Sequence, residues 1–550
     1  MKRTWWKESV IYQIYPRSYK DSTGNGIGDI PGIISKLEYI KSLGVDMIWI
    51  CPIYDSPNDD NGYDIRNYRM ISEEFGGDSA FDELITTMHN MGLKLVMDLV
   101  LNHSSDEHQW FEEARKSKDN PYRDYYHWLP PKNGKEPNNW TSLFNGSVWE
   151  FDDATEEYYL HLFTKKQPDL NWENPKVRQE IHDIVKFWAD KGVDGFRMDV
   201  ISMISKDLSF PDTECSSFID TINTHYANGP RIHEFLNEMN EAVLSKYDIM
   251  TVGEGPGIDL NTAPLYVKED RNELNMIFHF DHMFIDSGPG GKYDLQPFDL
   301  QKFKSVFGNW DDCLNNNGWG SIFLGNHDFS RMVSRFGNDA DYRVASSKLL
   351  GTILLTLRGT VYIYQGDEIG MTNVAYDSID DYNDVETLNA YKEAESQGKD
   401  MNEFFKLVHH LSRDNARSPM QWDASKNAGF SSGNPWLEVN TNYPLINVAS
   451  QESDPDSILN YFRRMIAFRK DHKTLVYGEY NCIDENDPAI FAYKRSDHEN
   501  DFLVVHNMSD EIQNWNHSQY NEYEMVMSNL EEMSNAEIYQ PWQSKIFKRK

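Results

Sequence analysis

Cysteine, basic residues and long apolar runs are all scarce in this 550-residue sequence. The four cysteines are widely separated and form neither a CxxC pair nor a Cys/His metal spacing, so we expect reduced thiols rather than a disulfide framework. No apolar segment approaches the roughly 20 residues that cross a bilayer. The N-terminal residues lack the apolar core of a signal peptide, and we therefore expect a cytoplasmic protein.

Basic residues are also few: the sequence has 53 Lys and Arg against 88 Asp and Glu, which gives a net charge of -35. Such a charge repels nucleic acids and anionic membranes, which excludes both as expected partners. A neutral small molecule meets no such barrier. Aromatic residues make up 13% of the chain, which fits either an ordinary core or a site where sugar rings stack on aromatic faces.

The first four-fifths of the chain alternates short apolar runs with amphipathic helices such as Ile33–Leu43 and Pro175–Lys191. Eight runs qualify as buried strands: Val10–Tyr15, Met47–Ile50, Leu93–Val100, Val193–Met198, Ile249–Val252, Met276–Phe280, Ile322–Leu324 and Val361–Tyr364. Eight such strand–helix units predict an α/β fold, a (β/α)₈ TIM barrel, rather than a doubly wound sheet.

Three segments interrupt or follow this alternation, and the chain is longer than one hydrophobic core usually supports. Residues 104–174 predict a small domain inserted after strand 3, between barrel parts 1–103 and 175–477. Residues of about 371–430 form a second insertion after strand 8, with a helix at Asp384–Ser396. Residues 478–550 change to short alternating runs, which predicts a C-terminal antiparallel β domain, a β-sandwich.

Polar residues follow five of the predicted strands, where a TIM barrel carries its chemistry. Asp199 and Glu254 end strands four and five, which are neighbours. Retaining cleavage of a glycosidic bond needs two carboxyl groups only about 5–5.5 Å apart, one as nucleophile and one as acid. Arg197 lies two residues before Asp199 on the same strand face, so we expect it to lower the pKa of Asp199.

Seven sequence blocks carry a family resemblance. They are Asp98–His103, Gly195–Ile201, Val252–Glu254, Phe323–Asp328, Gln167–Trp172, Gln365–Met371 and Arg413–Trp422. Taken in their order along the chain, they resemble glycoside hydrolase family thirteen, the α-amylase family, in its oligo-1,6-glucosidase, dextran glucosidase and α-glucosidase branch.

The resemblance implies a role for each matching residue. Asp199 would be the nucleophile, Glu254 the general acid/base and Asp328 a third carboxylate that binds ring hydroxyls. His103 and His327 would hydrogen-bond the sugar, and Arg197 would support the nucleophile. The remaining substrate-binding residues would be Asp60 and Arg413, which grip the non-reducing-end 4-hydroxyl, Tyr63, which stacks under the sugar, and Phe163 and Gln167 nearby.

Two neighbours of the catalytic pair bear on linkage. In this branch Val200, directly after the nucleophile, resembles enzymes that act on α-1,6 bonds; the less favoured alternative is that Val200 only fills space as a β-branched strand residue. The turn Gly255–Gly257 departs from the Thr-Trp pair of dextran glucosidases, which could favour transfer to other acceptors.

The segment Asp21–Asp29 looks like a calcium loop, with oxygen ligands on alternate residues and glycines that permit tight turns. The ligands would be Asp21, Thr23, Asn25, Ile27 and Asp29. Relatives have Asn and Asp where this chain has Thr23 and Asn25, so one carboxylate is lost. We expect structural Ca²⁺ here and no organic cofactor; a plain turn is the alternative.

Together these features predict an exo-acting retaining α-glucosidase that hydrolyses α-1,6 bonds at the non-reducing end of short oligosaccharides, as a monomer or weak homo-oligomer. Whether it also hydrolyses α-1,4 bonds is left open by the sequence. The alternative is a glucosyltransferase or sucrose isomerase that uses the same intermediate. A sugar-phosphate substrate lacks a supporting basic cluster. A non-catalytic barrel, as in amino-acid transporter complexes, would lack the three acids.

Overall fold

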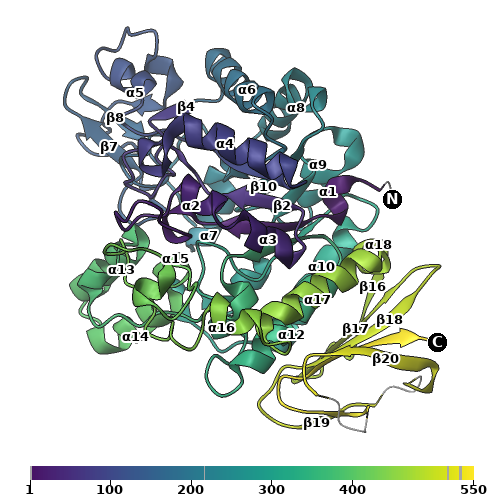
Figure 1. Cartoon of the computed structure of the whole chain (residues 1–550). Coiled ribbons are helices and arrows are strands. Elements are labelled where there is room, and N and C mark those ends of the chain that lie inside the picture. Colours follow the sequence, from purple (N-terminus) through teal and green to yellow (C-terminus); the bar gives the residue numbers. More distant parts are fainter. Residues whose placement is uncertain (1–2, 216, 517–519, 532–535) are drawn as a thin grey trace.

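The computed structural model describes residues 3–215, 217–516, 520–531 and 536–550 (Figure 1). Eight parallel strands form its central sheet, in the spatial order β11-β10-β9-β5-β2-β1-β15-β14. Their bounds are β1 Val10–Ile14, β2 Met47–Ile50, β5 Lys94–Val100, β9 Gly195–Asp199, β10 Met250–Glu254, β11 Met276–Phe278, β14 Ser321–Ile322 and β15 Thr360–Tyr364. All eight predicted strands are confirmed.

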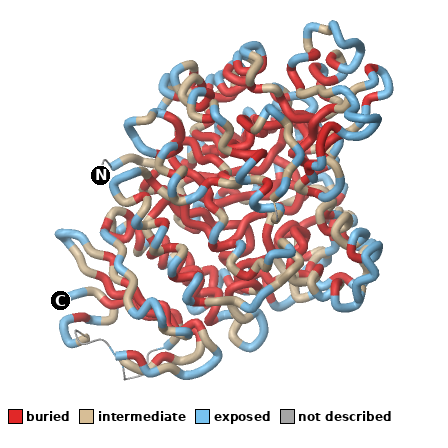
Figure 2. Tube along the Cα trace, turned by 180° about the vertical axis from the view of Figure 1, so that it is seen from behind, coloured by how far each residue is buried: buried red, intermediate tan, exposed pale blue. Residues whose placement is uncertain are grey.

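The two outer strands of this order lie next to each other, which makes the sheet a nearly closed barrel. The Ser321 hydroxyl on β14 donates a hydrogen bond of 2.7 Å to the carbonyl of Ile277 on β11. Helices surround the barrel, the longer ones being α4 Gly77–Asn90, α6 Pro175–Asp190, α8 Ile232–Ala242, α10 Leu300–Leu314, α12 Arg343–Thr356 and α17 Ile458–Asp471. The (β/α)₈ TIM barrel is confirmed, and Figure 2 shows that the buried residues fill the middle of the molecule.

One segment that was predicted as a single helix forms two helices in the structure. The segment Ile33–Leu43 is split into α2 (Ile30–Ile34) and α3 (Leu37–Leu43). The Ser35 hydroxyl donates a hydrogen bond of 2.6 Å to the carbonyl of Gly32, which competes with the helical ladder at this point. The apolar face is nevertheless kept across the break, since Ile33, Leu37 and Ile40 are all buried.

The insertion after β5 carries its own small sheet, in the order β6-β8-β7 (Trp128–Leu129, Glu157–Leu160 and Trp149–Asp152), and the helix α5 (Gln109–Ala114). The segment after β15 carries α13 (Val385–Ser396), α14 (Met401–Leu411) and α15 (Asp414–Arg417). In Figure 1 both lie to the left of the barrel, whereas the C-terminal strands lie at the lower right.

The C-terminal segment forms a five-stranded antiparallel sheet in the order β16-β17-β18-β22-β20, with a two-stranded sheet β19-β21. The larger sheet comprises β16 Glu479–Ile483, β17 Ile490–Ser496, β18 Asp501–Asn507, β20 Tyr523–Ser528 and β22 Ser544–Arg549; the smaller pairs β19 Gln513–Asn514 with β21 Ile538–Tyr539. Tyr539 from the small sheet and Phe547 from the large one share an apolar cluster, so the two sheets pack together. The predicted antiparallel β domain is confirmed.

None of the helices within the described ranges has the length and apolar character that a membrane span requires.

Candidate active site

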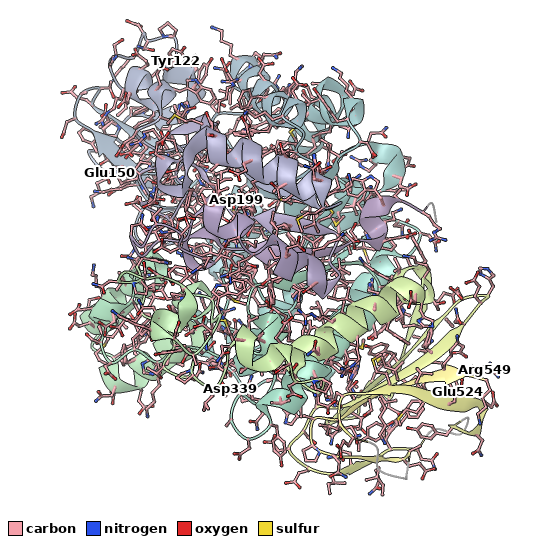
Figure 3. All side chains as sticks on the ribbon, in the orientation of Figure 1. Tyr122, Glu150, Asp199, Asp339, Glu524 and Arg549 are labelled. Atoms are coloured by element: carbon pink, nitrogen blue, oxygen red, sulfur yellow. The ribbon has the colours of Figure 1, made fainter. Side chains whose placement is uncertain are left out.

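Two of the three predicted catalytic residues, Asp199 and Glu254, lie with Asp98 and Arg197 at the carboxyl ends of three adjacent barrel strands. Asp98 lies on β5, Arg197 and Asp199 on β9, and Glu254 is the last residue of β10. The parallel register places Asp98 opposite Arg197, which sets both side chains at the same level of the barrel. Figure 3 shows Asp199 in the middle of the molecule, far from the outlying Tyr122 and Glu150 of the insertion.

Arg197 binds three carboxylates at once. Its Nη1 atom donates to Asp98 Oδ1 at 2.8 Å and to Asp199 Oδ1 at 2.7 Å, and its Nη2 atom donates to Glu254 Oε2 at 2.7 Å. The guanidinium is buried, with 3% of its side chain exposed. One cation therefore holds Asp199 and Glu254 side by side and fixes their relative position.

This sharing corrects the expectation that Arg197 keeps the pKa of Asp199 low. Burial raises the pKa of Asp199 well above its usual range, Arg197 opposes that rise, and the negative charges of Glu254 and Asp98 add to it. Three carboxyl groups around one guanidinium carry a surplus of negative charge. The cluster therefore retains a proton at a pH where an isolated aspartate has lost its own.

Val200, directly after the nucleophile, has a left-handed backbone, with φ 35° and ψ 43°. A β-branched residue rarely adopts this conformation, which costs on the order of 1–3 kcal/mol. The turn brings the Val200 N–H to 3.1 Å from Glu254 Oε2, the same oxygen that Arg197 binds. The strained turn thus helps to hold Glu254 in place and leaves its other oxygen unbound by these two donors.

Asp328 contacts two guanidinium groups and one histidine. Its Oδ1 atom accepts from Arg417 Nη2 at 2.9 Å and lies 3.4 Å from Arg413 Nη1, while its Oδ2 atom lies 3.0 Å from His327 Nε2. These neighbours hold the pKa of Asp328 well below its usual range despite its burial. Asp328 is therefore an ionised acceptor, and 27% of its side chain remains exposed.

The two predicted histidines are buried and uncharged. Burial lowers the pKa of His103 to about 4 and that of His327 to about 3. His327 bonds the Tyr63 hydroxyl at 2.7 Å and Gln13 Nε2 at 2.9 Å, and the Tyr63 ring stacks on it with 5.3 Å between centroids. His103 Nε2 lies 3.1 Å from the Tyr63 carbonyl and 3.2 Å from Gln167 Nε2.

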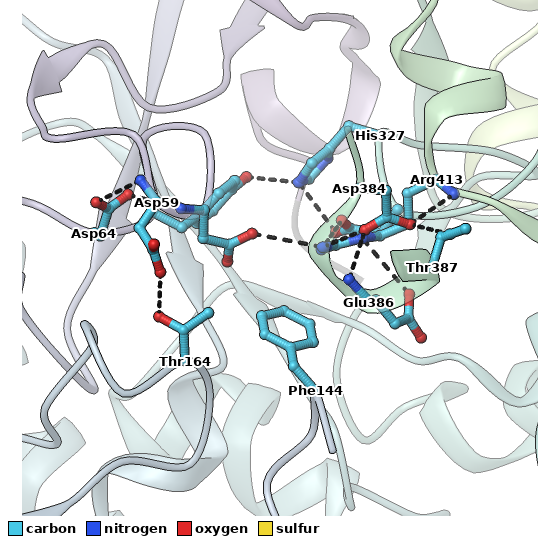
Figure 4. Close-up of polar contacts among 12 residues, drawn as sticks. Asp59, Asp64, Phe144, Thr164, His327, Asp384, Glu386, Thr387 and Arg413 are labelled. Carbon is cyan, nitrogen blue, oxygen red and sulfur yellow. Dashed lines mark hydrogen bonds and ion pairs between the residues drawn. The ribbon is translucent and has the colours of Figure 1, made fainter. Parts of the chain in front are cut away.

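Asp60 and Arg413, the residues predicted to bind the terminal 4-hydroxyl, form an ion pair. Asp60 Oδ1 and Arg413 Nη2 lie 3.5 Å apart, and Gln167 Nε2 donates to Asp60 Oδ2 at 3.3 Å. Burial raises the pKa of Asp60 to about 7, against the pull of Arg413. Asp60 Oδ1 is buried and makes no hydrogen bond with the described residues, so it is an acceptor that a ligand hydroxyl could satisfy. Figure 4 shows Arg413 of this pair beside Asp384.

The insertion contributes two phenylalanines to the same region. Phe163 lies 4.9 Å from the His103 ring and 5.6 Å from the Phe144 ring. Phe144 in turn carries the Arg413 guanidinium over its face at 4.8 Å. The Tyr63 hydroxyl also donates to Asp98 Oδ2 at 3.1 Å. These contacts therefore link all twelve residues predicted for catalysis and substrate binding, from the barrel and its insertions, into one network that includes Asp199.

Four further residues complete the site and had no role in the sequence-based prediction: Asp98, Phe144, Asp384 and Arg417. Asp384 caps α13 and accepts a hydrogen bond of 2.8 Å from Arg413 Nε. In the sequence, Asp384 could be recognised only as the residue before a helix, which does not reveal its contact with Arg413. Asp98 and Arg417 lay inside the recognised blocks. Phe144 lay in the insertion without any distinguishing pattern.

The predicted calcium loop forms a tight turn that precedes α2. Asp21 accepts hydrogen bonds of 2.8 Å from the N–H groups of Gly24 and Gly26, and Asp29 caps α2 by accepting from Gly32 N–H at 2.6 Å. No group of three or more His, Cys, Asp or Glu side chains within the described ranges is placed to hold a metal ion. The loop offers two carboxylates and otherwise neutral oxygens, a donor set whose chemistry fits a hard cation.

Comparison with known proteins identifies the family. Residues 13–478 match the model of the alpha-amylase catalytic domain. The chain belongs to the alpha-amylase family.

Within the alpha-amylase family, this chain is similar over nine-tenths or more of its length to several bacterial proteins. It is 55% identical to an oligo-1,6-glucosidase of Parageobacillus thermoglucosidasius, over 100% of this chain and 99% of that one. It is 47% identical to a trehalose-6-phosphate hydrolase of Bacillus subtilis, over 92% of this chain and 89% of that one. A solved structure of an isomaltulose synthase variant from Erwinia rhapontici with sucrose is 44% identical, covers 100% of this chain and 99% of that one, and superposes with a TM-score of 0.96.

From the surplus of negative charge around Arg197 we predict how a substitution of Asp199 changes the thermal stability of the protein. A buried aspartate whose folded-state pKa is raised destabilises the fold at pH values above its unfolded pKa, because folding then opposes its ionisation. We therefore expect Asp199→Asn to raise the Tm at pH 7, on the order of 2 °C, and to raise it less near pH 4. Arg197 is not orphaned, since it keeps Asp98 and Glu254.

Thermal unfolding at both pH values provides the measurement. A Tm at pH 7 that is lower in Asp199→Asn than in the wild type would contradict the charge surplus, because it would mean that Arg197 outweighs burial.

Proposed function

We propose that the chain is an exo-acting retaining α-glucosidase of the oligo-1,6-glucosidase type, which releases glucose from the non-reducing end of short oligosaccharides. The observation that carries this proposal is the shared guanidinium: Asp199 and Glu254 each lie 2.7 Å from Arg197. Such sharing suits the short separation that retention requires, about 5–5.5 Å. The similarity to proteins named oligo-1,6-glucosidase supports the substrate class.

The reaction proceeds in two steps. Asp199 attacks the anomeric carbon while Glu254 gives its proton to the leaving oxygen, which produces a glucosyl ester on Asp199 and frees the remaining sugar. Glu254, now ionised, then takes a proton from water as that water attacks the ester, which releases glucose and restores both groups. The cluster must hold one proton in the free enzyme, and substrate binding must leave it on Glu254.

The other residues recognise the glucose. Asp328 is ionised and partly exposed, so it accepts hydrogen bonds from ring hydroxyls. The neutral His103 and His327 bond further hydroxyls. Tyr63 stacks under the sugar ring. Asp60 and Arg413, which lie 3.5 Å apart, bind the terminal 4-hydroxyl and so close the pocket at the non-reducing end, which makes the action exo.

The cellular setting follows from the same features. We propose that the enzyme works in the cytoplasm on a neutral oligosaccharide, as a monomer or weak homo-oligomer. Its four cysteines all have free thiols, which suits a reducing compartment.

Linkage preference tests the proposal most closely. We expect kcat/KM to be higher for isomaltose than for maltose, and Val200→Thr to lower that ratio about 10-fold, because one small group in the wall beside the leaving sugar is worth about 1–3 kcal/mol. Val344→Thr is the matched control, since Val344 is 43% exposed. A wild-type ratio well below one would overturn the α-1,6 preference.

The alternative is a glucosyltransferase or sucrose isomerase, favoured by the structural similarity to isomaltulose synthase. The turn after Glu254 is small, and the Ser202 hydroxyl and Asn228 Nδ2 hold the carbonyls of Pro256 and Gly257 at 2.6 Å. No bulky side chain follows Glu254 in this turn to contact the leaving sugar. Incubation with sucrose separates the two functions: glucose and fructose support the hydrolase, and mainly an isomer supports the alternative.

We also propose that the loop Asp21–Asp29 binds Ca²⁺ in a stabilising role. The ligands would be the side-chain oxygens of Asp21, Thr23, Asn25 and Asp29 and the carbonyl of Ile27, and the ion would cross-link the loop to the start of α2. We expect chelation by EDTA to lower the Tm and added Ca²⁺ to restore it, with about 2.7 kcal/mol of stabilisation when free Ca²⁺ is about 100 times Kd.

Thermal unfolding with EDTA, Ca²⁺ and Mg²⁺ checks this expectation without any activity assay. A Tm that responds to none of them would mean that the loop is a turn held only by its own hydrogen bonds.

A further inference from the structure

The two insertions of the barrel contact each other next to Arg413 of the site. Asn389, on α13 in the segment after β15, donates its Nδ2–H to the carbonyl of Phe144, in the insertion after β5, at 2.9 Å. The two residues are 245 positions apart in the sequence. This hydrogen bond therefore joins two elements that leave the barrel at different strands.

Phe144 is the residue that this contact holds in place. Its N–H donates to the Ser142 hydroxyl at 3.0 Å, and its ring packs 5.6 Å from Phe163. On its other side the ring lies 4.8 Å from the guanidinium of Arg413. Figure 4 shows Phe144 beside Arg413 and Asp384. A shift of the Phe144 backbone would move a neighbour of the residue that closes the site.

One face of α13 makes the rest of the contact. Asn389 lies four residues after Val385 and three after Glu386, so the three side chains share a helix face. Val385 packs against the apolar cluster that contains Phe144 and Val200. Glu386 lies 3.5 Å from Arg413 Nε. The Asn389 bond is thus one part of a seam between the two insertions, beside the ion pair of Asp60 and Arg413.

We propose that Asn389 is a specificity-determining positioning residue: it keeps the two insertions joined over the non-reducing end of the bound glucose and so excludes chains that extend past that glucose. The proposal rests on the proposed exo-glucosidase function. The bond needs an N–H donor because its acceptor is a carbonyl. Asn389 reaches the substrate only through Phe144 and Arg413, so it takes no part in the bond-breaking steps.

The test uses full-length variants at position 389. Asn389→Asp keeps the shape and removes the donor, and Asn389→Ala removes the side chain beyond Cβ. Asn402→Ala, at an exposed position of α14, is the matched control. Each variant is assayed on isomaltose and on an aryl α-isomaltotrioside whose terminal glucose carries a 4,6-acetal cap. Tm is recorded for all four proteins.

We expect both Asn389 variants to raise KM for isomaltose about 2- to 10-fold, the range for one lost neutral hydrogen bond, with kcat within about twofold of the wild type. They should also gain cleavage of the capped substrate, which the wild type and Asn402→Ala reject. Loss of a merely structural bond would lower Tm and would affect all substrates in proportion.

The proposal is overturned if Asn389→Asp matches Asn402→Ala in KM and still rejects the capped substrate. A wild type that does not hydrolyse isomaltose overturns the proposed function instead, and a wild type that readily cleaves the capped substrate overturns the exo assignment. These outcomes distinguish the Asn389 inference from the function on which it rests.

Discussion

The guanidinium of Arg197 is the contact on which the rest of the site depends. It lies between Asp98, Asp199 and Glu254, and all three carboxylates would repel one another without it. One positive charge does not balance three negative ones in a buried place, so the cluster is held in a state that retains a proton. Burying these charged groups lowers the stability of the fold but keeps an acid and a nucleophile close together. Catalytic sites commonly show this conflict between stability and activity.

The barrel and its insertions have different roles in the active site. Parallel strands bring the reactive groups to one end because their carboxyl ends meet there, and the register of β5 and β9 sets Asp98 opposite Arg197. The insertions supply Phe144, Phe163 and Arg413, which surround the sugar rather than react with it. Changes in these segments can alter which substrate fits while leaving the chemistry unaffected.

Much of this arrangement could be predicted from the sequence, because buried strands leave apolar runs and catalytic residues follow them directly. Asp199 and Glu254 were found in this way, and the eight strands lie within about two residues of their predicted ends. Contacts that cross between distant segments left no such pattern. The bond from Asn389 to Phe144 and the second role of the helix cap Asp384 depend on how two insertions meet in space.

Two errors have clear physical causes. The pKa of Asp199 was expected to be low because Arg197 was assumed to pair with Asp199 alone. In the structure Arg197 binds three carboxyl groups. The helix expected at Ile33–Leu43 is broken because a serine hydroxyl competes for a backbone carbonyl. The left-handed backbone of Val200 could not have been predicted, since β-branched residues rarely adopt it.

The stereochemistry of rescue by azide tests the central assignment most directly. With an activated aryl α-glucoside, Asp199→Gly should lose hydrolysis and, in azide, form β-glucosyl azide, because azide enters through the space that the nucleophile leaves. Glu254→Ala should form α-glucosyl azide, because azide then attacks the glucosyl ester of Asp199 from the opposite face. The same anomer from both variants, or undiminished hydrolysis by Asp199→Gly, would contradict the roles given to this pair.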